Sequence, residues 1–362
     1  MTVKELIARS KAAQAAFAFA TQEQADAAAR AICKVVYDNA EKLGPMAAEE
    51  SRMGSEQDKI AKCRNKSALI WESLKDKKSC DIINRIEERR MIEVAKPVGV
   101  VASIIPSTNP VVTPMSNGAF ALKCRNSVIF APHPRAVKCT KLLVEMFRAE
   151  LKKLGLPEDL VLGLEEVSND LTSELMSAAD MVVATGGMGM VKAAYSSGKP
   201  AIGVGQGNVQ CIIDEDADMA DAVGKIIIGR AFDNGLICLG EQTVFVPEDK
   251  EAEFVAEMKK QGGYLVEGEE NVNKLREGLF PGGGAFSRVV VGMFADQVSD
   301  EIGLGAPKGT RVLFAKAKAL GAGDVLCREK LCPVIAYMTY KTFKEGVAMM
   351  EANLDHEGKG HS

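Results

Sequence analysis

Apolar residues recur at helical spacing through the first quarter of the chain. Between Val3 and Phe19 they stand three or four positions apart, which predicts an amphipathic helix. Thr21 and Gln24 form a capping-box pattern, which predicts a second helix running toward Leu43. A third helix is expected over about residues 56–74. We expect these helices to pack on a sheet. The alternative, that the first is a targeting or encapsulation peptide, is less favoured because no flexible linker follows it.

The pattern becomes strand-like near Asp81. Residues 82–95 alternate around a charged turn, which predicts a β-hairpin. Short apolar runs then alternate with helical stretches as far as Ser197. This succession predicts an α/β fold with a parallel, doubly wound sheet, which binds ligands beyond the carboxyl ends of its strands. Strands are expected at 98–105, 127–131, 160–164 and 181–185. Helices are expected at about 136–154 and 170–178, and a third helix follows the last strand and ends at 197.

A second unit is expected to begin near Arg230. It contains one clear helical stretch and several short apolar runs, and no internal repeat separates it from the first unit. Its helix is expected at 250–261 and its strands at 243–246, 289–291, 312–315 and 334–339. The run of glycines after Pro281 predicts a surface loop.

Composition removes several classes of function. The 45 basic and 49 acidic residues give a net charge of −4 without a basic block, so no nucleic-acid partner is expected. No apolar run is long enough to span a membrane, and the N-terminus has no signal-peptide core. The nine cysteines are odd in number and irregularly spaced, which favours reduced thiols in the cytoplasm. With only three histidines in the chain, no metal site is expected, even at Cys327 and Cys332.

Cys238 lies in a half-apolar run, where a lone cysteine is more often a packing residue than a nucleophile. His133, His356 and His361 are distant in sequence, so a protease-like Cys–His pair is unsupported. Asn109 closes the short segment that follows the strand expected at 98–105, and it precedes a proline. Its amide can donate to a developing oxyanion, or the residue can simply form a turn.

Two glycine-rich turns suggest nucleotide binding, although each is a weak signal. Residues 184–190 stand where a strand becomes a helix, so backbone amides there can approach a diphosphate. Residues 203–208 form a second such turn. Neither is the usual G-x-G-x-x-G fingerprint at the first strand–helix junction.

Taken in order, these segments resemble the aldehyde dehydrogenase superfamily, and within it the CoA-acylating branch. That branch includes acylating succinate-semialdehyde and sulfoacetaldehyde dehydrogenases and the aldehyde half of bifunctional alcohol/aldehyde dehydrogenase. The matching segments are Pro106–Pro110, Ala131–Arg135, Ala184–Gly187, Ala193–Pro200, Phe232–Gly235 with Cys238, and Glu329–Pro333. The resemblance covers essentially the whole chain. Residues 36–41 and 75–78 are most similar to the succinate-semialdehyde members.

The resemblance implies a role for each matching residue. Cys238 would attack the aldehyde, and Asn109 would hold the oxyanion together with the Cys238 backbone N–H. Thr185 and Gly186 would lie near the diphosphate of NAD or NADP, and Glu329 would hold the nicotinamide ribose. Further cofactor contacts are implied for Ser107, Thr108, Pro132, His133, Arg135, Gly187 and Gly205. Arg135 and Lys138 are candidates for a phosphate of coenzyme A or NADP, or are ordinary solvated charges.

Two departures distinguish the chain from the hydrolytic members. Those enzymes have a glutamate base 34 residues before the cysteine, where this chain has Val204. A valine cannot take a proton from water, so the thioester would await a better nucleophile, a thiol. Ala131 also replaces the lysine that many hydrolytic members use for the adenosine ribose. Both departures favour the CoA-acylating branch.

The resemblance implies a Rossmann-type cofactor domain at 1–229 and a smaller α/β catalytic domain at 230–355. The cofactor domain would contain a helical part at about 1–78 and a hairpin at about 82–96. Family members continue beyond residue 362, so 356–362 are expected to begin a truncated return segment.

The expected activity is reversible, NAD(P)-dependent, CoA-acylating oxidation of succinate semialdehyde by a homodimer or higher homo-oligomer. Sulfoacetaldehyde or acetaldehyde as substrate, an acyl-phosphate-linked semialdehyde reductase and a truncated, non-catalytic nucleotide-binding subunit remain alternatives.

Overall fold

The computed structural model describes residues 1–359, which form two compact units. Unit 1 comprises residues 1–52 and 56–204, and unit 2 comprises 53–55 and the chain from 205 onward. The division thus lies earlier than the boundary expected near residue 230. The reason is that β8 (Val209–Ile212) pairs with β9 (Glu241–Pro247), and α9 (Met219–Ala231) shares the core on that sheet. The roles expected for the two domains, cofactor binding and catalysis, stay predictions.

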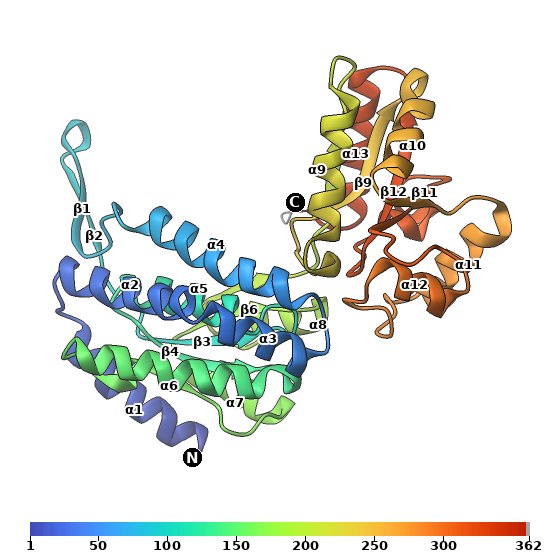
Figure 1. Cartoon of the computed structure of the whole chain (residues 1–362). Coiled ribbons are helices and arrows are strands. Elements are labelled where there is room, and N and C mark those ends of the chain that lie inside the picture. Colours follow the sequence, from blue (N-terminus) through green and yellow to red (C-terminus); the bar gives the residue numbers. More distant parts are fainter. Residues whose placement is uncertain (360–362) are drawn as a thin grey trace. The chain divides into compact units, whose positions relative to one another are not determined.

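Unit 1 is built on a five-stranded parallel sheet with the order β5-β4-β3-β6-β7 (Figure 1). The strands are β3 (Val100–Ile105), β4 (Ser127–Pro132), β5 (Val161–Gly163), β6 (Met181–Thr185) and β7 (Ala201–Val204). Numbered within this sheet, the order is 3-2-1-4-5, and it reverses between β3 and β6. The predicted doubly wound sheet is therefore confirmed.

Helices cover both faces of this sheet. Alternate residues of β3 face opposite layers, as the period of a strand requires. Val101 and Ile105 join a core with α2 and α6, whereas Val100 and Ile104 join a core with α7 and α8. The helices of unit 1 are α1 (Val3–Phe17), α2 (Gln22–Asp38), α3 (Ala40–Ser51), α4 (Glu56–Leu74), α5 (Val112–Lys123), α6 (Val137–Lys153), α7 (Asn169–Ala178) and α8 (Met188–Tyr195).

The N-terminal helices follow their sequence signals closely. α1 buries Val3, Leu6 and Phe17, so it packs on the unit as expected. α2 begins with the predicted capping box at Thr21 and Gln24. It ends before the predicted Leu43, because Asn39 leaves helical geometry and α3 starts at the next residue.

A β-hairpin projects from unit 1, as the alternation of residues 82–95 predicts (Figure 1). β1 (Asp81–Ile86) and β2 (Met91–Ala95) pair antiparallel. Their apolar residues Ile82, Met91, Ile92 and Val94 are exposed.

No described helix is both long and apolar enough to cross a membrane.

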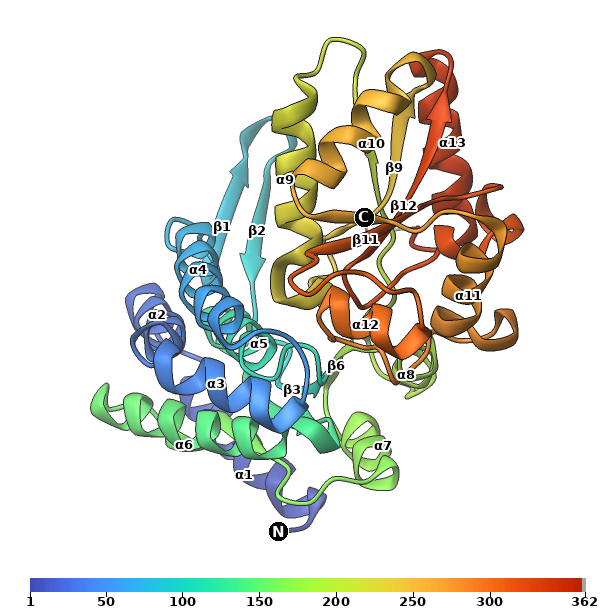
Figure 2. The ribbon, with the colours of Figure 1, turned by 45° about the vertical axis from the view of Figure 1, so that its right-hand side comes forward.

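Unit 2 contains a second five-stranded parallel sheet, with the order β10-β11-β12-β9-β8. The remaining elements are α10 (Glu251–Lys260), β10 (Gly263–Leu265), α11 (Glu269–Leu279), α12 (Ala295–Ile302), β11 (Val312–Lys316), β12 (Val334–Tyr340) and α13 (Phe343–His356). One core joins the sheet to α9 and α10, and another joins it to α11 and α12 (Figure 2).

The strand predicted at 289–291 is wrong. Val290 is buried beside α11 and α12, but the chain there forms an irregular turn rather than a strand. Gly292 has a φ of 69°, and its carbonyl accepts a hydrogen bond from the Gly54 N–H at 3.0 Å. A positive φ interrupts a strand, so the short apolar run ends in a loop.

Candidate active site

Cys238 follows a sharply folded turn between α9 and β9. Asp233, Asn234 and Gly235 take consecutive left-handed conformations, with φ of 49°, 52° and 72°. Such a conformation is costly for residues other than glycine, and strain of this kind often marks functional sites. Leu236 beyond the turn is buried, whereas Cys238 is partly exposed. The turn therefore brings the thiol to the surface of unit 2.

Buried hydrogen bonds hold this turn. The Asn234 side-chain amide donates to the Gly292 carbonyl at 2.9 Å, and the Ser55 N–H donates to Asp233 Oδ1 at 3.2 Å. A Cβ on Gly235 would lie 2.6 Å from the carbonyl oxygen of Cys332. Only glycine fits there, so the Phe232–Gly235 segment is shaped by close backbone packing.

Arg230 connects the base of the turn to the segment that carries Glu329. Its guanidinium is fully buried and donates to the carbonyls of Lys330 and Cys332. Burial lowers the pKa of Arg230 to about 10, so it stays charged at neutral pH, and the nearby Glu329 and Glu241 favour that charge. The turn before Cys238 and the predicted ribose-binding segment are therefore both held by the buried Arg230 side chain.

Glu329 is itself buried and lies against the second glycine-rich turn. Its Oε1 accepts a hydrogen bond from the Gly207 N–H at 3.1 Å, two residues beyond Gly205. Burial raises the pKa of Glu329 to about 7, and the Gly207 N–H opposes that shift. The structure thus brings Glu329 and the turn that contains Gly205 together.

Asn109 lies in unit 1, directly beyond the carboxyl end of β3. Its side-chain oxygen accepts a hydrogen bond from Lys62 Nζ at 3.0 Å, and its Nδ2 is 3.4 Å from Thr108 Oγ1. Lys62 comes from α4 and is only 5% exposed. Sequence reasoning missed Lys62. The one available signal was its spacing of three residues from Lys59, which is also buried on α4.

The other predicted residues of unit 1 gather at the same edge of the sheet. Ser107 and Thr108 follow β3, Thr185 ends β6, and Gly186 and Gly187 lead into α8. β3 and β6 are the neighbours between which the strand order reverses, where doubly wound sheets bind their ligands. A Cβ on Gly187 would meet nothing within 4 Å, so a ligand can approach this backbone closely.

The segment after β4 reaches this edge too. Pro132 is buried and pairs with Ile105, whereas His133 and Arg135 are exposed. His133 Nδ1 accepts a hydrogen bond from the Arg135 N–H at 3.1 Å. The Lys138 N–H donates to the Glu50 carboxylate at 2.6 Å, so a protein carboxylate already covers this end of α6. Exposed Arg135 remains a candidate for a cofactor phosphate.

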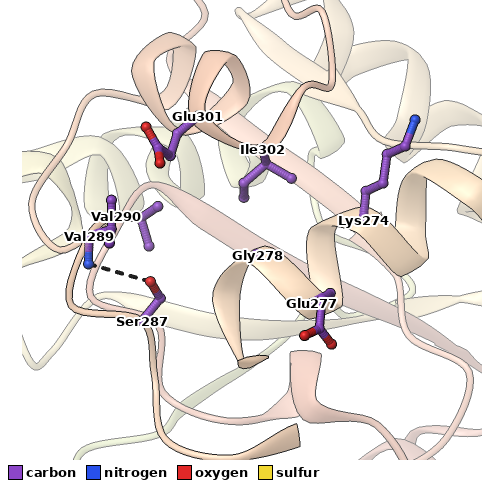
Figure 3. Close-up of a pocket in the computed structure, with 8 residues that line it drawn as sticks. All are labelled: Lys274, Glu277, Gly278, Ser287, Val289, Val290, Glu301 and Ile302. Carbon is purple, nitrogen blue, oxygen red and sulfur yellow. Dashed lines mark hydrogen bonds between the residues drawn. The ribbon is translucent and has the colours of Figure 1, made fainter. Parts of the chain in front are cut away.

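A separate hollow of about 340 Å³ lies between α11 and α12 in unit 2 (Figure 3). Its lining residues are Lys274, Glu277, Gly278, Ser287, Val289, Val290, Glu301 and Ile302. None of the predicted site residues is among them. The turn of Cys238 and the sheet edge of unit 1 therefore stay the predicted site, apart from this hollow.

Comparison with known proteins identifies the family of the chain. The aldehyde dehydrogenase family pattern matches residues 1–272. The chain is 47% identical to the acetylating succinate-semialdehyde dehydrogenase of Clostridium kluyveri, over all of this chain and 80% of that protein.

Two solved structures are similar over 99% of this chain. An acetylating aldehyde dehydrogenase from Geobacillus thermoglucosidasius is 36% identical, with a TM-score of 0.94 over 79% of its length. A propionaldehyde dehydrogenase from Rhodopseudomonas palustris, solved with bound CoA and an acylated cysteine, is 27% identical, with a TM-score of 0.86 over 81% of its length. The chain therefore belongs to the aldehyde dehydrogenase family, within its CoA-acylating branch of oxidoreductases that act on aldehydes.

Proposed function

We propose that this protein converts succinate semialdehyde, CoA and NAD(P)+ reversibly to succinyl-CoA, NAD(P)H and a proton. The observation that carries the proposal is the strained turn that presents the Cys238 thiol. In addition, Val204 stands at the position where the hydrolytic enzymes have the glutamate that activates water. The choice of aldehyde is supported by the 47% identity to the Clostridium kluyveri enzyme.

The proposed chemistry begins at Cys238. Its sulfur attacks the aldehyde carbon to form a thiohemiacetal, while the Asn109 amide and the Cys238 N–H donate to the oxyanion. When bound, NAD(P)+ would accept the hydride from that carbon, which leaves an acyl thioester on Cys238. The thiol of CoA then displaces Cys238 and gives the acyl-CoA.

Val204 determines the fate of the thioester in this proposal. It ends β7, paired with Thr185. An apolar side chain at this position cannot deprotonate water, so hydrolysis lacks a base and the thioester survives until a thiol arrives.

The residues of unit 1 fit a dinucleotide. The strand order reverses beside Thr185, and the open space above Gly187 leaves backbone amides accessible to a diphosphate. Glu329 of unit 2 would accept the ribose hydroxyls, and exposed Arg135 would contact a phosphate of CoA or NADP.

The test is an assay of NAD(P)H formation with succinate semialdehyde, sulfoacetaldehyde and acetaldehyde, each with NAD+ and NADP+, and with CoA present or absent. We expect sustained turnover only with CoA, and the highest kcat/KM with succinate semialdehyde. Formation of free acid without CoA at an equal rate would contradict the acylating mechanism. Turnover with phosphate in place of CoA would support an acyl-phosphate-linked reductase. A better rate with sulfoacetaldehyde or acetaldehyde would correct the substrate alone.

We also propose that the protein is a homodimer or higher homo-oligomer. The β1–β2 hairpin carries exposed Ile92 and Val94 on paired strands, and burial against a second copy would remove this apolar area from water. Light scattering should give a mass of at least two chains, and Ile92→Lys with Val94→Lys should lower it. A monomeric wild-type chain would contradict this proposal.

A cytoplasmic location is proposed from the cysteines. All nine are thiols rather than disulfides, which suits a reducing compartment. Cell fractionation that recovers the protein outside the cytoplasm would contradict it.

A further inference from the structure

Lys62 is a buried cation whose amino group contacts the proposed oxyanion residue. Its Nζ lies 3.0 Å from Asn109 Oδ1, and its side chain is almost completely removed from water. Burying an ammonium group is costly unless polar partners compensate it.

The contact determines which way the Asn109 amide points. A side-chain amide has one oxygen that accepts and one nitrogen that donates, and an ammonium group can only donate. With Lys62 beside it, the oxygen must face Lys62, so Nδ2 faces the other way. The weak 3.4 Å contact of Nδ2 with Thr108 Oγ1 leaves this donor available to a stronger acceptor.

The charge adds a second effect. A cation at the amide oxygen draws electron density from the nitrogen, which makes the Nδ2–H group a stronger donor through the chain of hydrogen bonds. An oxyanion donor contributes most when it is oriented before charge develops on the substrate. Orientation and polarisation by Lys62 both favour the transition state over the bound aldehyde.

The α4 helix holds Lys62 firmly enough for this task. Cys63 and Ser67 on the same helix are buried, and Ser67 Oγ donates to the Cys63 carbonyl. A Cβ on Gly44 of α3 would overlap Ile60, so the two helices approach closely at this level.

We propose that Lys62 is a positioning residue that orients and polarises Asn109 for oxyanion stabilisation. This inference rests on the proposed function, in which Asn109 donates to the thiohemiacetal oxygen.

The test is a double-mutant cycle of Lys62→Met and Asn109→Ala, measured with the full chain, succinate semialdehyde, CoA and NAD(P)+. Removing one oxyanion donor costs about 10²–10³ in kcat, and we expect Lys62→Met to cost about 10–10² with KM values nearly unchanged. In the Asn109→Ala background, Lys62→Met should cost less than about twofold, because no amide remains to orient.

Two further variants separate positioning from folding. Lys59→Met alters the equally buried lysine one turn earlier on α4, and it should lower the melting temperature without any coupling to Asn109. Lys62→Gln keeps a donor but loses the charge, so its kcat should lie between wild type and Lys62→Met. This variant also serves if Lys62→Met fails to fold.

Four results would overturn the inference. Multiplicative losses in the double mutant would mean that Lys62 acts independently of Asn109. A raised KM for succinate semialdehyde alone, with kcat unchanged, would make Lys62 a contact for the substrate carboxylate. Full activity of Asn109→Ala would remove both the inference and the oxyanion assignment, whereas an inactive Asn109→Ala with an unaffected Lys62→Met would remove the inference alone.

Discussion

The two segments that would act on the aldehyde are held in opposite ways. Asn109 follows β3 in a turn without left-handed residues, and the ammonium of Lys62 orients its amide. Cys238 follows three left-handed residues in a row, held by backbone carbonyls and by packing too close for any side chain at Gly235. To orient the amide of Asn109, only the last side-chain torsion has to be fixed, and one charged neighbour can do this. To position the short side chain of Cys238, the backbone conformation has to be fixed, and this requires close packing of the turn.

This difference predicts two kinds of failure. Substitutions around Asn109 should lower the rate with little loss of stability, whereas substitutions in the turn before Cys238 should lower both. The predictions that follow test this division, beginning with the largest expected effect.

Cys238→Ser should abolish aldehyde oxidation. A serine hydroxyl is a much weaker nucleophile than a cysteine thiolate, so we expect kcat to fall by more than about a thousandfold. One atom changes on a partly exposed side chain, so stability should change by less than about 0.5 kcal/mol. The measurements are the burst of NAD(P)H and thermal unfolding.

Cys124→Ser is the matched control, because Cys124 is an exposed thiol in unit 1. It should keep wild-type activity. A Cys238→Ser variant that retained full turnover would disprove the nucleophile assignment. A variant that unfolded would show that the Cys238 side chain is also needed for stability, which contradicts the proposed division.

Gly235→Ala should damage both stability and rate. Its φ of 72° is unfavourable for alanine, and the new Cβ would lie 2.6 Å from the Cys332 carbonyl oxygen. Left-handed strain and overpacking together should cost about 3 kcal/mol. Displacement of the turn should lower kcat about tenfold or more, because the sulfur would leave its reactive position.

Gly303→Ala separates the two causes. Gly303, at the C-terminal end of α12, is also left-handed, with a φ of 76°, but a Cβ there would meet nothing within 4 Å. It should cost only about 1 kcal/mol and leave kcat unchanged. Equal losses in both variants would mean that conformation alone, rather than contact with Cys332, shapes the turn.

The sequence was sufficient for the elements with strong local signals. α4 spans Glu56–Leu74 and β6 spans Met181–Thr185, as predicted, because helical periodicity and short buried runs indicate such elements. The parallel, doubly wound character of the sheet followed from the alternation of strands and helices, whereas its strand order comes from the structure.

Long-range features were beyond such reasoning. The contact of Lys62 with Asn109 joins residues 47 positions apart, and the contact of Gly207 with Glu329 joins residues 122 apart. The predicted strand at 289–291 failed because burial of Val290 depends on two helices that follow and precede it. Local periodicity carries no information on such partners.

Glu329 differs from the rest of the unit 2 site, because its role depends on its charge rather than on backbone packing. Its substitution is expected to have the smallest effect on the rate. Burial raises its pKa from 4.5 to about 7, so between these values the folded chain holds a proton that the unfolded chain has lost. Stability should therefore fall as pH rises from about 4.5 to 7. Burial lowers the pKa of neighbouring Lys330 from 10.5 to about 7, so above pH 7 stability should rise again.

Glu329→Gln should remove the first limb of this profile and leave the second. The variant should match wild type at pH 4.5 and exceed it by about 1–3 kcal/mol at pH 7, measured by thermal or urea unfolding. Glu166→Gln, at an exposed carboxylate, is the control and should leave the profile unchanged. If the ionised carboxylate holds the ribose, the wild-type KM for NAD(P)+ should also fall as pH rises through about 7, and that of the variant should not. The substitution could change the pH dependence of stability and leave the pH dependence of KM for NAD(P)+ as it is in wild type. Glu329 would then support the Gly207 turn without binding the ribose. In that case a charged residue would orient the oxyanion donor Asn109, but none of this kind would hold the cofactor.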